Sequence, residues 1–570
     1  MIKIVCSYSC LLTSNIIRVG AILFIILLQF SCGINKSMQS RPDISGLEKV
    51  DTLRTKHNDS LYSIGKNTLL KNKYGIWELY IEGGALERGI INGSLTRELM
   101  HKQEMAFMTK IESLVPSGGY QNFLSKMIGW FNRKIYLYIP EEYKQEIYGI
   151  SRFALPKHNS FAPAYLRMLY LHGAHDIGHA LQDLMLVGCT SFAAWDTNTD
   201  DGKLLLGRNF DFYAGDEFAE EKIIAFINPD EGHKFMMYTW GGMIGVVSGM
   251  NERGLTVTIN AAKSKIPLIA KTPISLVARE ILQYAENTEE AIAIARKREV
   301  FVSESIMIGS AAENKAILIE VSPNNFGVYE VPNSEQLICS NHFQSEEFQD
   351  DKRNSEAILE SHTQYRYDRM KELLATNTSL NPEKAAAILR NKDGLLGADL
   401  GFGNEKAINQ LLAHHGIIFK PEERKVWVSA NPYQLGAFVA YDLDAAFNIF
   451  EKGPNLKSVM NASETISADE FIYSDEFRDY EEFRILYRKL YQLVADGKPV
   501  KTVKTEDFDK LIQLNPNYWK AYALAGDYYF QQKKYKKAII NFKQAKKREV
   551  TTLTDLNYLE KMIAKSIRKL

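Results

Sequence analysis

Short alternations of apolar and polar residues dominate the middle of the chain. They predict strands at 190–195, 203–206, 222–227, 235–240, 245–248 and 255–259, separated by turns rich in Gly, Asn, Asp and Pro. Helical spacing follows at 274–284 and 288–296, and strand patterns return at 305–309, 316–321, 325–330 and 336–340. Strands, then helices, then strands predict an α+β layered sandwich rather than a doubly wound parallel sheet.

The segment before this region has two parts that differ in their pattern of apolar and polar residues. Residues 33–71 are polar and poorly patterned, which predicts a tether. Residues 72–188 begin with a strand-like alternation at 77–83 and continue with mostly helical spacing. We therefore expect a helical segment between the tether and the central sandwich.

The last part of the chain, residues 474–570, has a helical pattern and becomes lysine-rich toward its end. Seven of its residues fall at the spacing of a tetratricopeptide helix pair: Tyr522, Gly526, Tyr529, Tyr535, Ala538, Phe542 and Ala545. One repeat is fewer than the three normally needed for stability, so we expect this module to pack on neighbouring helices or on the sandwich. A plain helical bundle is the alternative interpretation.

The N-terminus carries a targeting signal. Lys3 and Arg18 precede an apolar run at 21–28, which is shorter than the roughly 20 residues that cross a bilayer. The run is typical of a signal-peptide core, and Cys32 after a small residue resembles a bacterial lipoprotein signal. We expect residues 1–32 to be this signal, with Cys32 lipidated and the protein exported to the cell envelope. Ordinary secretion or an uncleaved anchor is the alternative.

Charge and cysteine content narrow the class of protein. Lys plus Arg balance Asp plus Glu at 69 each, which gives no indication of a nucleic-acid partner. Of the five cysteines, Cys6 and Cys10 lie in the signal, and only Cys189 and Cys339 lie in the body of the chain. An exported protein with two such cysteines is not a disulfide scaffold, so we expect one of them to have a chemical role.

Cys189 stands in the motif that carries the chemistry, Gly-Cys-Thr-Ser at 188–191, followed by Gly-Arg-Asn-Phe-Asp at 207–211. A free thiol has a pKa of about 8.5, whereas an α-amino group has a pKa of about 7.7–8.0 and suits general base work. A cysteine at a chain terminus therefore carries nucleophile and base together. Cleavage between Gly188 and Cys189 would free that amine, and we expect Gly188 to tolerate the unusual backbone that the cleavage demands.

These motifs resemble the penicillin acyltransferase branch of the N-terminal nucleophile hydrolases, which are related to the bile-salt and penicillin V amidases. The resemblance covers about 77–438 and includes Gly89, Gly93 and Leu95, which resemble the family's propeptide signature. It implies a four-layer αββα catalytic domain over 189–473, a propeptide segment over 72–188, and no cofactor or metal. The implied reaction is hydrolysis or acyl transfer at a linear amide of a small molecule, through a Cys189 thioester.

The resemblance also assigns further site residues. Arg208 would favour the thiolate, and Asp211 would hold the new α-amine; the alternative for both is a surface salt bridge. Asn260 matches the family's oxyanion asparagine and Asn341 a second active-site asparagine, with turn or cap residues as the alternative. Arg366 resembles the late arginine of these sites, and Arg369 competes for that place.

Three other interpretations remain open. Cys339 is a rival nucleophile, although its apolar strand is typical of a small buried residue. His175 and His179, with Asp176 between them and His172 nearby, resemble a zinc-binding helix and would make the protein a metal-dependent hydrolase. A non-catalytic lipoprotein adaptor that holds a protein partner with its helical tail is the last alternative.

Overall fold

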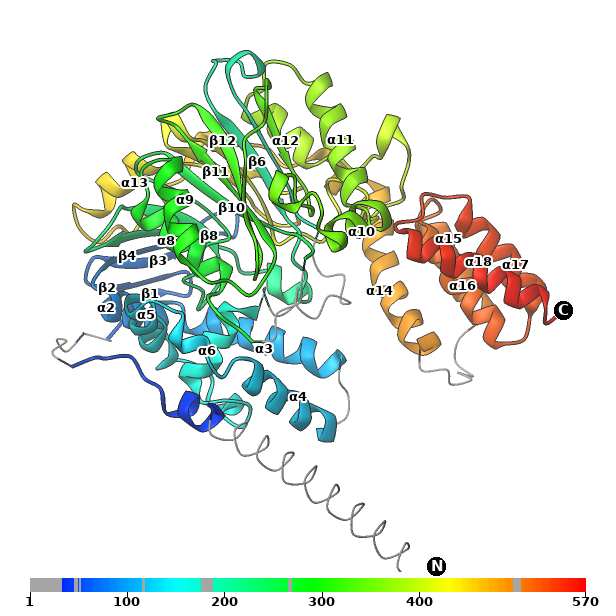
Figure 1. Cartoon of the computed structure of the whole chain (residues 1–570), viewed down its shortest axis with the longest axis horizontal. Coiled ribbons are helices and arrows are strands. Elements are labelled where there is room, and N and C mark those ends of the chain that lie inside the picture. Colours follow the sequence, from blue (N-terminus) through cyan, green and yellow to red (C-terminus); the bar gives the residue numbers. More distant parts are fainter. Residues whose placement is uncertain are drawn as a thin grey trace, which may run out of the picture.

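Two β-sheets lie face to face between outer layers of helices in the computed structural model of the chain (Figure 1). The structure describes residues 33–45, 50, 53–114, 118–174, 176, 188–264, 269–495 and 504–570. The order of layers is helix, sheet, sheet, helix, and a helical module follows at the C-terminus. The predicted α+β, four-layer αββα fold is confirmed.

The larger sheet has 11 strands, and its order is β1-β2-β3-β4-β7-β8-β9-β10-β11-β12-β13. Neighbouring strands are antiparallel except β4 and β7, which are parallel. The strands are β1 (Thr55–Asn58), β2 (Leu61–Ile64), β3 (Asn67–Lys71), β4 (Trp77–Gly83), β7 (Ile223–Pro229), β8 (Phe235–Thr239), β9 (Ser248–Asn251), β10 (Leu255–Ala261), β11 (Glu304–Ser310), β12 (Lys315–Val321) and β13 (Phe326–Tyr329).

The smaller sheet has seven antiparallel strands in the order β14-β5-β6-β15-β16-β17-β18. They are β14 (Gln336–Cys339), β5 (Thr190–Ala194), β6 (Leu205–Phe210), β15 (His415–Lys420), β16 (Lys425–Ser429), β17 (Phe438–Asp442) and β18 (Asn461–Ile466). The β5–β6 hairpin brings both halves of the cysteine motif side by side, because Ser191 pairs with Arg208 and Thr190 with Asn209.

The inner core fills the space between the two sheets. Phe226 and Leu318 from the larger sheet and Leu206 and Ile417 from the smaller one belong to this core, and each is at most 1% exposed. α13 (Leu443–Phe450) closes one edge, where the Phe450 ring stacks on Tyr80 at 4.4 Å. Burial of this apolar layer on both sheets holds the sandwich together.

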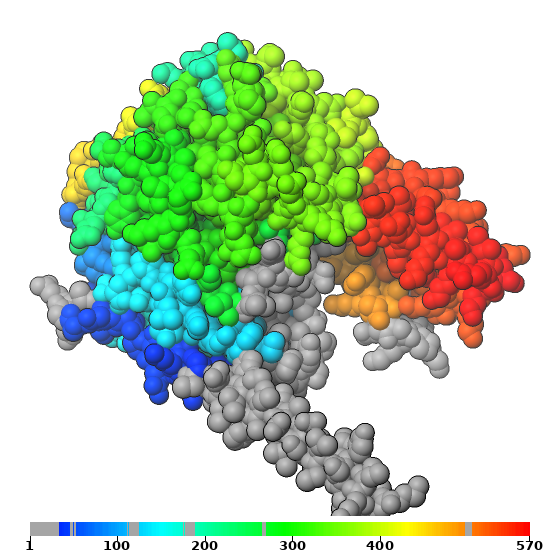
Figure 2. Space-filling view, viewed as in Figure 1, coloured from blue at the N-terminus to red at the C-terminus, as the bar shows by residue number. Residues whose placement is uncertain are grey.

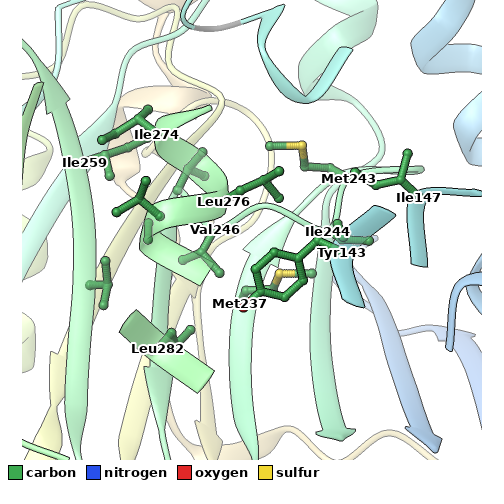
Figure 3. Packing of buried hydrophobic residues seen from close by; sticks show 14 of the residues in the cluster. Tyr143, Ile147, Met237, Met243, Ile244, Val246, Ile259, Ile274, Leu276 and Leu282 are labelled. Atoms are coloured by element: carbon green, nitrogen blue, oxygen red, sulfur yellow. The ribbon is translucent and has the colours of Figure 1, made fainter. Parts of the chain in front are cut away.

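A second apolar core lies between the larger sheet and its helices. These helices are α2 (Ala85–Leu95), α3 (Arg97–Leu114), α4 (Gly118–Phe131), α5 (Glu141–Ser151), α6 (Ala164–His172), α8 (Ile274–Tyr284) and α9 (Thr288–Lys297). Figure 3 shows side chains of this layer, among them Tyr143 of α5, Met237 of β8 and Ile274 of α8. In the other outer layer, α11 (Thr363–Thr376) and α12 (Pro382–Leu389) cover the smaller sheet, and α10 (Lys352–Glu360) contacts α11.

The C-terminal module contains α14 (Asp475–Ala495), α15 (Thr505–Leu514), α16 (Trp519–Gln531), α17 (Tyr535–Lys546) and α18 (Leu553–Ile567). It projects from the side of the sandwich (Figure 2). A Cβ added at Gly526 of α16 would lie 2.6 Å from the Phe542 ring of α17, so the two helices cross closely there. The expected helical module is present, and its identification as a tetratricopeptide repeat stays a prediction.

α14 joins the module to the sandwich through polar contacts. The Tyr480 hydroxyl donates to the Leu411 main-chain oxygen at 3.2 Å, and Arg484 forms an ion pair with Asp216. The Tyr433 hydroxyl donates to Glu481 at 2.9 Å. All three sandwich residues lie in loops or short turns rather than in the sheets, so α14 fixes connecting segments.

The predicted tether is wrong over most of its length. Residues 55–71 form β1, β2 and β3 of the larger sheet instead of a tether. β4 and the helices of 72–188 share one core with the strands that follow, so the predicted propeptide segment packs on the catalytic domain, and the boundary between 188 and 189 stays a prediction. The predicted signal at 1–32, including Cys32, lies outside the described residues. In the part of the chain that the structure describes, no helix has the length and apolar character to cross a membrane.

The crossing of α2 and α5 gives a first test. A Cβ added at Gly89 would lie 2.0 Å from the Glu146 main-chain oxygen, which cannot move without shifting α5. Gly89→Ala should therefore lower the free energy of unfolding by about 3 kcal/mol, measured by urea denaturation. Gly129→Ala is the matched control, since nothing lies within 4 Å of that site. It should gain about 0.5–1 kcal/mol from helix propensity. Equal stabilities for both variants would contradict the packing argument.

Candidate active site

Cys189 lies directly before β5, at the end of the hairpin that β5 forms with β6. Its side chain is fully buried and belongs to the apolar core on the helix side of the larger sheet. Burial raises the pKa of the thiol to about 11, although the nearby Arg208 guanidinium opposes that rise. In the uncut chain the thiol is therefore protonated at neutral pH, and it needs a base to become a nucleophile.

Arg208 extends from β6 across the interior to the opposite sheet. Its guanidinium donates to the Val247 main-chain oxygen at 3.1 Å, to the Ser248 hydroxyl at 2.6 Å and to the Ile259 main-chain oxygen. One of its nitrogens lies 3.7 Å from the Cys189 sulfur. The side chain is 1% exposed, so the surface salt bridge considered as the alternative is wrong. A buried cation at this distance stabilises a thiolate.

Asp211 lies just beyond the end of β6 and is also fully buried. Burial raises the pKa of its carboxyl to about 7, and Arg366 and Arg208 oppose this shift. The Gln434 side-chain amide donates to one carboxyl oxygen at 3.4 Å, while the other oxygen has no hydrogen-bond partner among the described residues. A carboxyl that titrates near neutral pH can accept or release a proton during a reaction.

Arg366 of α11 reaches the nucleophile from the smaller sheet's helical layer. Its guanidinium donates to the Cys189 main-chain oxygen at 2.8 Å, to the Thr190 hydroxyl at 2.5 Å and to the Asn341 side-chain oxygen at 2.6 Å. Arg369, the competing choice, contacts Glu372 and Asn391 instead. The structure therefore places Arg366, and not Arg369, at the predicted site.

The two asparagines lie in the same cluster with their amides already bonded. Asn260 of β10 donates to the Cys339 main-chain oxygen at 3.1 Å and accepts from the Ser191 hydroxyl at 2.9 Å. Asn341 donates to the Ala261 main-chain oxygen at 2.7 Å. Both link the two sheets near Cys189, and their roles as active-site donors stay predictions.

Gly188 is required for space rather than for backbone freedom. It is not among the glycines with a positive φ, so a left-handed backbone is not what requires glycine at this position. A Cβ there would lie 2.4 Å from the Gln410 side-chain nitrogen. That nitrogen donates to the Gly188 main-chain oxygen at 2.9 Å, and the Gly188 N–H donates to the Asp211 main-chain oxygen at 3.2 Å.

Several residues of the cluster carry no motif in the sequence. Gln410 and Gln434 contact Gly188 and Asp211 from loops more than 200 residues further along the chain. Ser248, which binds Arg208, in turn contacts the His415 ring at 2.9 Å. Burial lowers the pKa of His415 well below its ordinary value, so this ring is neutral. Only the fold could reveal these partners.

The rival chemistries find little support. Cys339 is buried in the inner core, and burial raises the pKa of its thiol well above the ordinary range, which fits a packing residue. His172 uses both ring nitrogens, one at 2.7 Å from the Met168 main-chain oxygen and the other accepting from the Ile244 N–H. His175 and His179 lie outside the described residues. Among the residues described, no group of three or more His, Cys, Asp or Glu side chains could hold a metal ion.

The chain spans about half the length of the sequence relatives that it matches. An uncharacterised protein of Archaeoglobus fulgidus is 27% identical over 277 residues, which cover 45% of this chain and 45% of that protein. Protein dcd1B of Dictyostelium discoideum is 24% identical over 297 residues, which cover 48% of this chain and 55% of that protein.

Solved structures with a similar fold include two hydrolases. A Caenorhabditis elegans N-acylethanolamine-hydrolyzing acid amidase ortholog is 17% identical and covers 41% of this chain and 93% of its own, with a TM-score of 0.30. A mutant of the conjugated bile acid hydrolase from Clostridium perfringens is 13% identical and covers 45% of this chain and 92% of its own, also with a TM-score of 0.30. Such distant likeness says nothing about the substrate.

The family comparison covers most of the site. Residues 197–432 match the family of acyl-coenzyme A:6-aminopenicillanic acid acyl-transferase. The match begins after Cys189 and includes Arg208, Asp211, Asn260 and Arg366. This stretch of the chain is therefore similar to that acyl-transferase family, which agrees with the resemblance of its motifs to the penicillin acyltransferase branch of the N-terminal nucleophile hydrolases.

Proposed function

We propose that the chain cleaves itself between Gly188 and Cys189 and then acts on linear amides through a Cys189 thioester. The family match supports an enzyme of the acyltransferase and amidase class. One observation carries the finer proposal. Polar groups surround the Gly188–Cys189 peptide. The Gly188 main-chain oxygen accepts from Gln410, and the Cys189 main-chain oxygen accepts from Arg366. Arg208 lies 3.7 Å from the Cys189 sulfur, and the Gly188 N–H donates to the Asp211 main-chain oxygen.

The self-cleavage is an acyl shift followed by hydrolysis. The Cys189 sulfur bonds to the Gly188 carbonyl carbon, the peptide C–N bond breaks, and the thiol proton ends on the Cys189 nitrogen. Water then hydrolyses the thioester, which leaves a Gly188 carboxylate, a free thiol and a new α-amine. Every atom of this sequence comes from the chain and one water molecule.

Asp211 supports the first proton transfer. Its pKa of about 7 lies four units below the thiol's value of about 11, so moving the proton costs about 5 kcal/mol. A reaction that takes minutes to hours has a barrier of about 20 kcal/mol or more, so this cost is compatible with self-processing. Asp211 therefore serves as proton acceptor before cleavage and as a partner for the α-amine afterwards.

After cleavage the α-amine replaces Asp211 as the base. Its ordinary pKa of about 7.7–8.0 lies close to the operating pH, so the amine can accept the thiol proton during turnover. The thiolate attacks the substrate amide carbon, the amine product leaves with a proton, and the acyl group stays on Cys189. Water completes a hydrolysis, and an amine acceptor completes an acyl transfer.

The proposed setting is the cell envelope, with lipid on Cys32 and the helical module free to hold a protein partner. This part rests on the signal pattern at 1–32. Cys32→Ser should shift the protein from the detergent phase to the aqueous phase in a Triton X-114 partition, and labelled palmitate should be lost from it. Equal partition of both forms would contradict lipidation.

Intact-mass analysis of purified protein tests the cleavage directly. We expect two chains, the second of which begins at Cys189. Cys189→Ala should give one uncut and inactive chain because it lacks the nucleophile, and Cys189→Ser should be cut slowly because a hydroxyl is harder to ionise. A single unbroken chain that hydrolyses amides would disprove the mechanism.

Asp211 gives a pH test of stability. Its folded pKa of about 7 exceeds the ordinary value of 3.8, so between these values the folded chain keeps a proton that the unfolded chain loses. The contribution of Asp211 to the free energy of unfolding should therefore be largest below pH 4 and fall by up to about 4 kcal/mol as pH rises to 7. Urea titrations of uncut Cys189→Ala protein measure this fall.

Adding Asp211→Asn to the same protein should remove this contribution, since the amide does not titrate, so the difference between the two pH profiles measures it. Asp350→Asn is the matched control, because this aspartate is exposed, and it should keep the original slope. A slope unchanged by Asp211→Asn would mean that the buried carboxyl does not control it.

A further inference from the structure

Gln410 occupies a place in the site that no motif assigns. Its side-chain nitrogen donates to the Gly188 main-chain oxygen at 2.9 Å, and the side chain is only 2% exposed. That oxygen belongs to the carbonyl that the Cys189 sulfur must attack. We propose that Gln410 is a catalytic residue of the self-cleavage, where it stabilises the negative charge that develops on the Gly188 oxygen.

The proposal rests on the self-cleavage proposed above. When the sulfur bonds to the Gly188 carbon, the carbonyl becomes tetrahedral and its oxygen gains a full negative charge. A donor already held at hydrogen-bond distance strengthens its bond as this charge forms. In a buried site the gain is larger than in water, because few other dipoles compensate the charge.

The predicted donors are bonded elsewhere. The Asn260 amide donates to the Cys339 main-chain oxygen, and Arg366 donates to the oxygen of Cys189 rather than to that of Gly188. Arg208 points to the sulfur and to the opposite sheet. In the described part of the chain, Gln410 is thus the side chain that donates to the oxygen under attack.

The loop that carries Gln410 is held in a costly conformation. The next residue, Leu411, has a φ of 52°, a left-handed conformation that costs a non-glycine residue about 1–2 kcal/mol. Its N–H donates to the Asn409 side chain at 3.0 Å, and its main-chain oxygen accepts from Tyr480 of α14 at 3.2 Å. Strain that surrounding bonds maintain is typical of positions where a side chain must be aimed.

Gly188 and Gln410 also fit each other sterically. A Cβ at Gly188 would lie 2.4 Å from the Gln410 nitrogen and 2.9 Å from its side-chain oxygen. Only glycine therefore lets the amide approach this carbonyl. The residue before the nucleophile and the donor act as a matched pair.

The test compares cleavage rates in cell-free translation, where uncut chain is followed by mass after synthesis stops. Gln410→Met keeps the length of the side chain but removes the donor, and it should slow cleavage about 10²-fold. Gln531→Met is the matched control, because Gln531 also donates to a main-chain oxygen, that of Val494 at 2.8 Å, but within the C-terminal module. It should change the rate less than twofold.

Gln410→Glu separates donation from packing. A protonated glutamic acid at this position can still donate, whereas a carboxylate cannot. Its cleavage should therefore fall as pH rises through the pKa of the new carboxyl, relative to the native chain. A purely structural role would not produce this additional pH dependence.

Three outcomes distinguish the proposals. Native chain that is cut, with slow Gln410→Met and pH-dependent Gln410→Glu, supports the role of Gln410. Native chain that is cut while both variants are cut at the native rate and pH profile overturns this role and leaves the self-cleavage intact. Native chain that is never cut overturns the self-cleavage and the role of Gln410 with it.

Discussion

The Arg208 guanidinium, buried between two sheets, is the interaction on which the site depends. Removing such a charge from water is expensive, and the cost is met only when the surrounding groups satisfy its hydrogens. Two main-chain oxygens and the Ser248 hydroxyl of the opposite sheet accept from its two terminal nitrogens, while Nε has no hydrogen-bond partner among the described residues. These bonds tie the β5–β6 hairpin to β9 and β10, and they fix the nucleophile relative to the rest of the sandwich.

A second constraint is the balance of charges around Cys189. Two guanidinium groups and one carboxyl are fully buried beside a thiol that burial makes hard to ionise. The arrangement keeps the thiol protonated in the uncut chain and places a carboxyl with a pKa near 7 beside it. This combination suits a slow reaction that happens once per molecule, and the α-amine freed by it suits repeated turnover.

The central sandwich could be predicted because its strands alternate clearly and its helices have long apolar faces. The helix predicted at 274–284 begins and ends at the observed residues of α8. β1 was missed because Thr55–Asn58 is exposed along its whole length and carries no apolar alternation. Its pairing with β2 places it in the sheet, and pairing between strands is invisible to a local pattern.

The sequence predicted only those residues of the site that belong to a recognisable motif. Cys189, Arg208 and Asp211 lie within one hairpin, so their spacing identifies them. Gln410 and Gln434 enter from distant loops, where glutamine has no distinctive neighbours. The choice of Arg366 over Arg369 depended on which face of α11 meets β5, and the sequence of a helix with polar residues on several sides does not settle that.

α14 reaches the site without touching the nucleophile. Tyr480 binds the residue after Gln410, Glu481 binds the residue before Gln434, and Arg484 binds Asp216 in the segment that follows Asp211. The helical tail is thus built into the framework of the catalytic centre. Exchanging tails between related proteins would demand matching loops in the recipient, so we expect the two parts to be inherited as one unit.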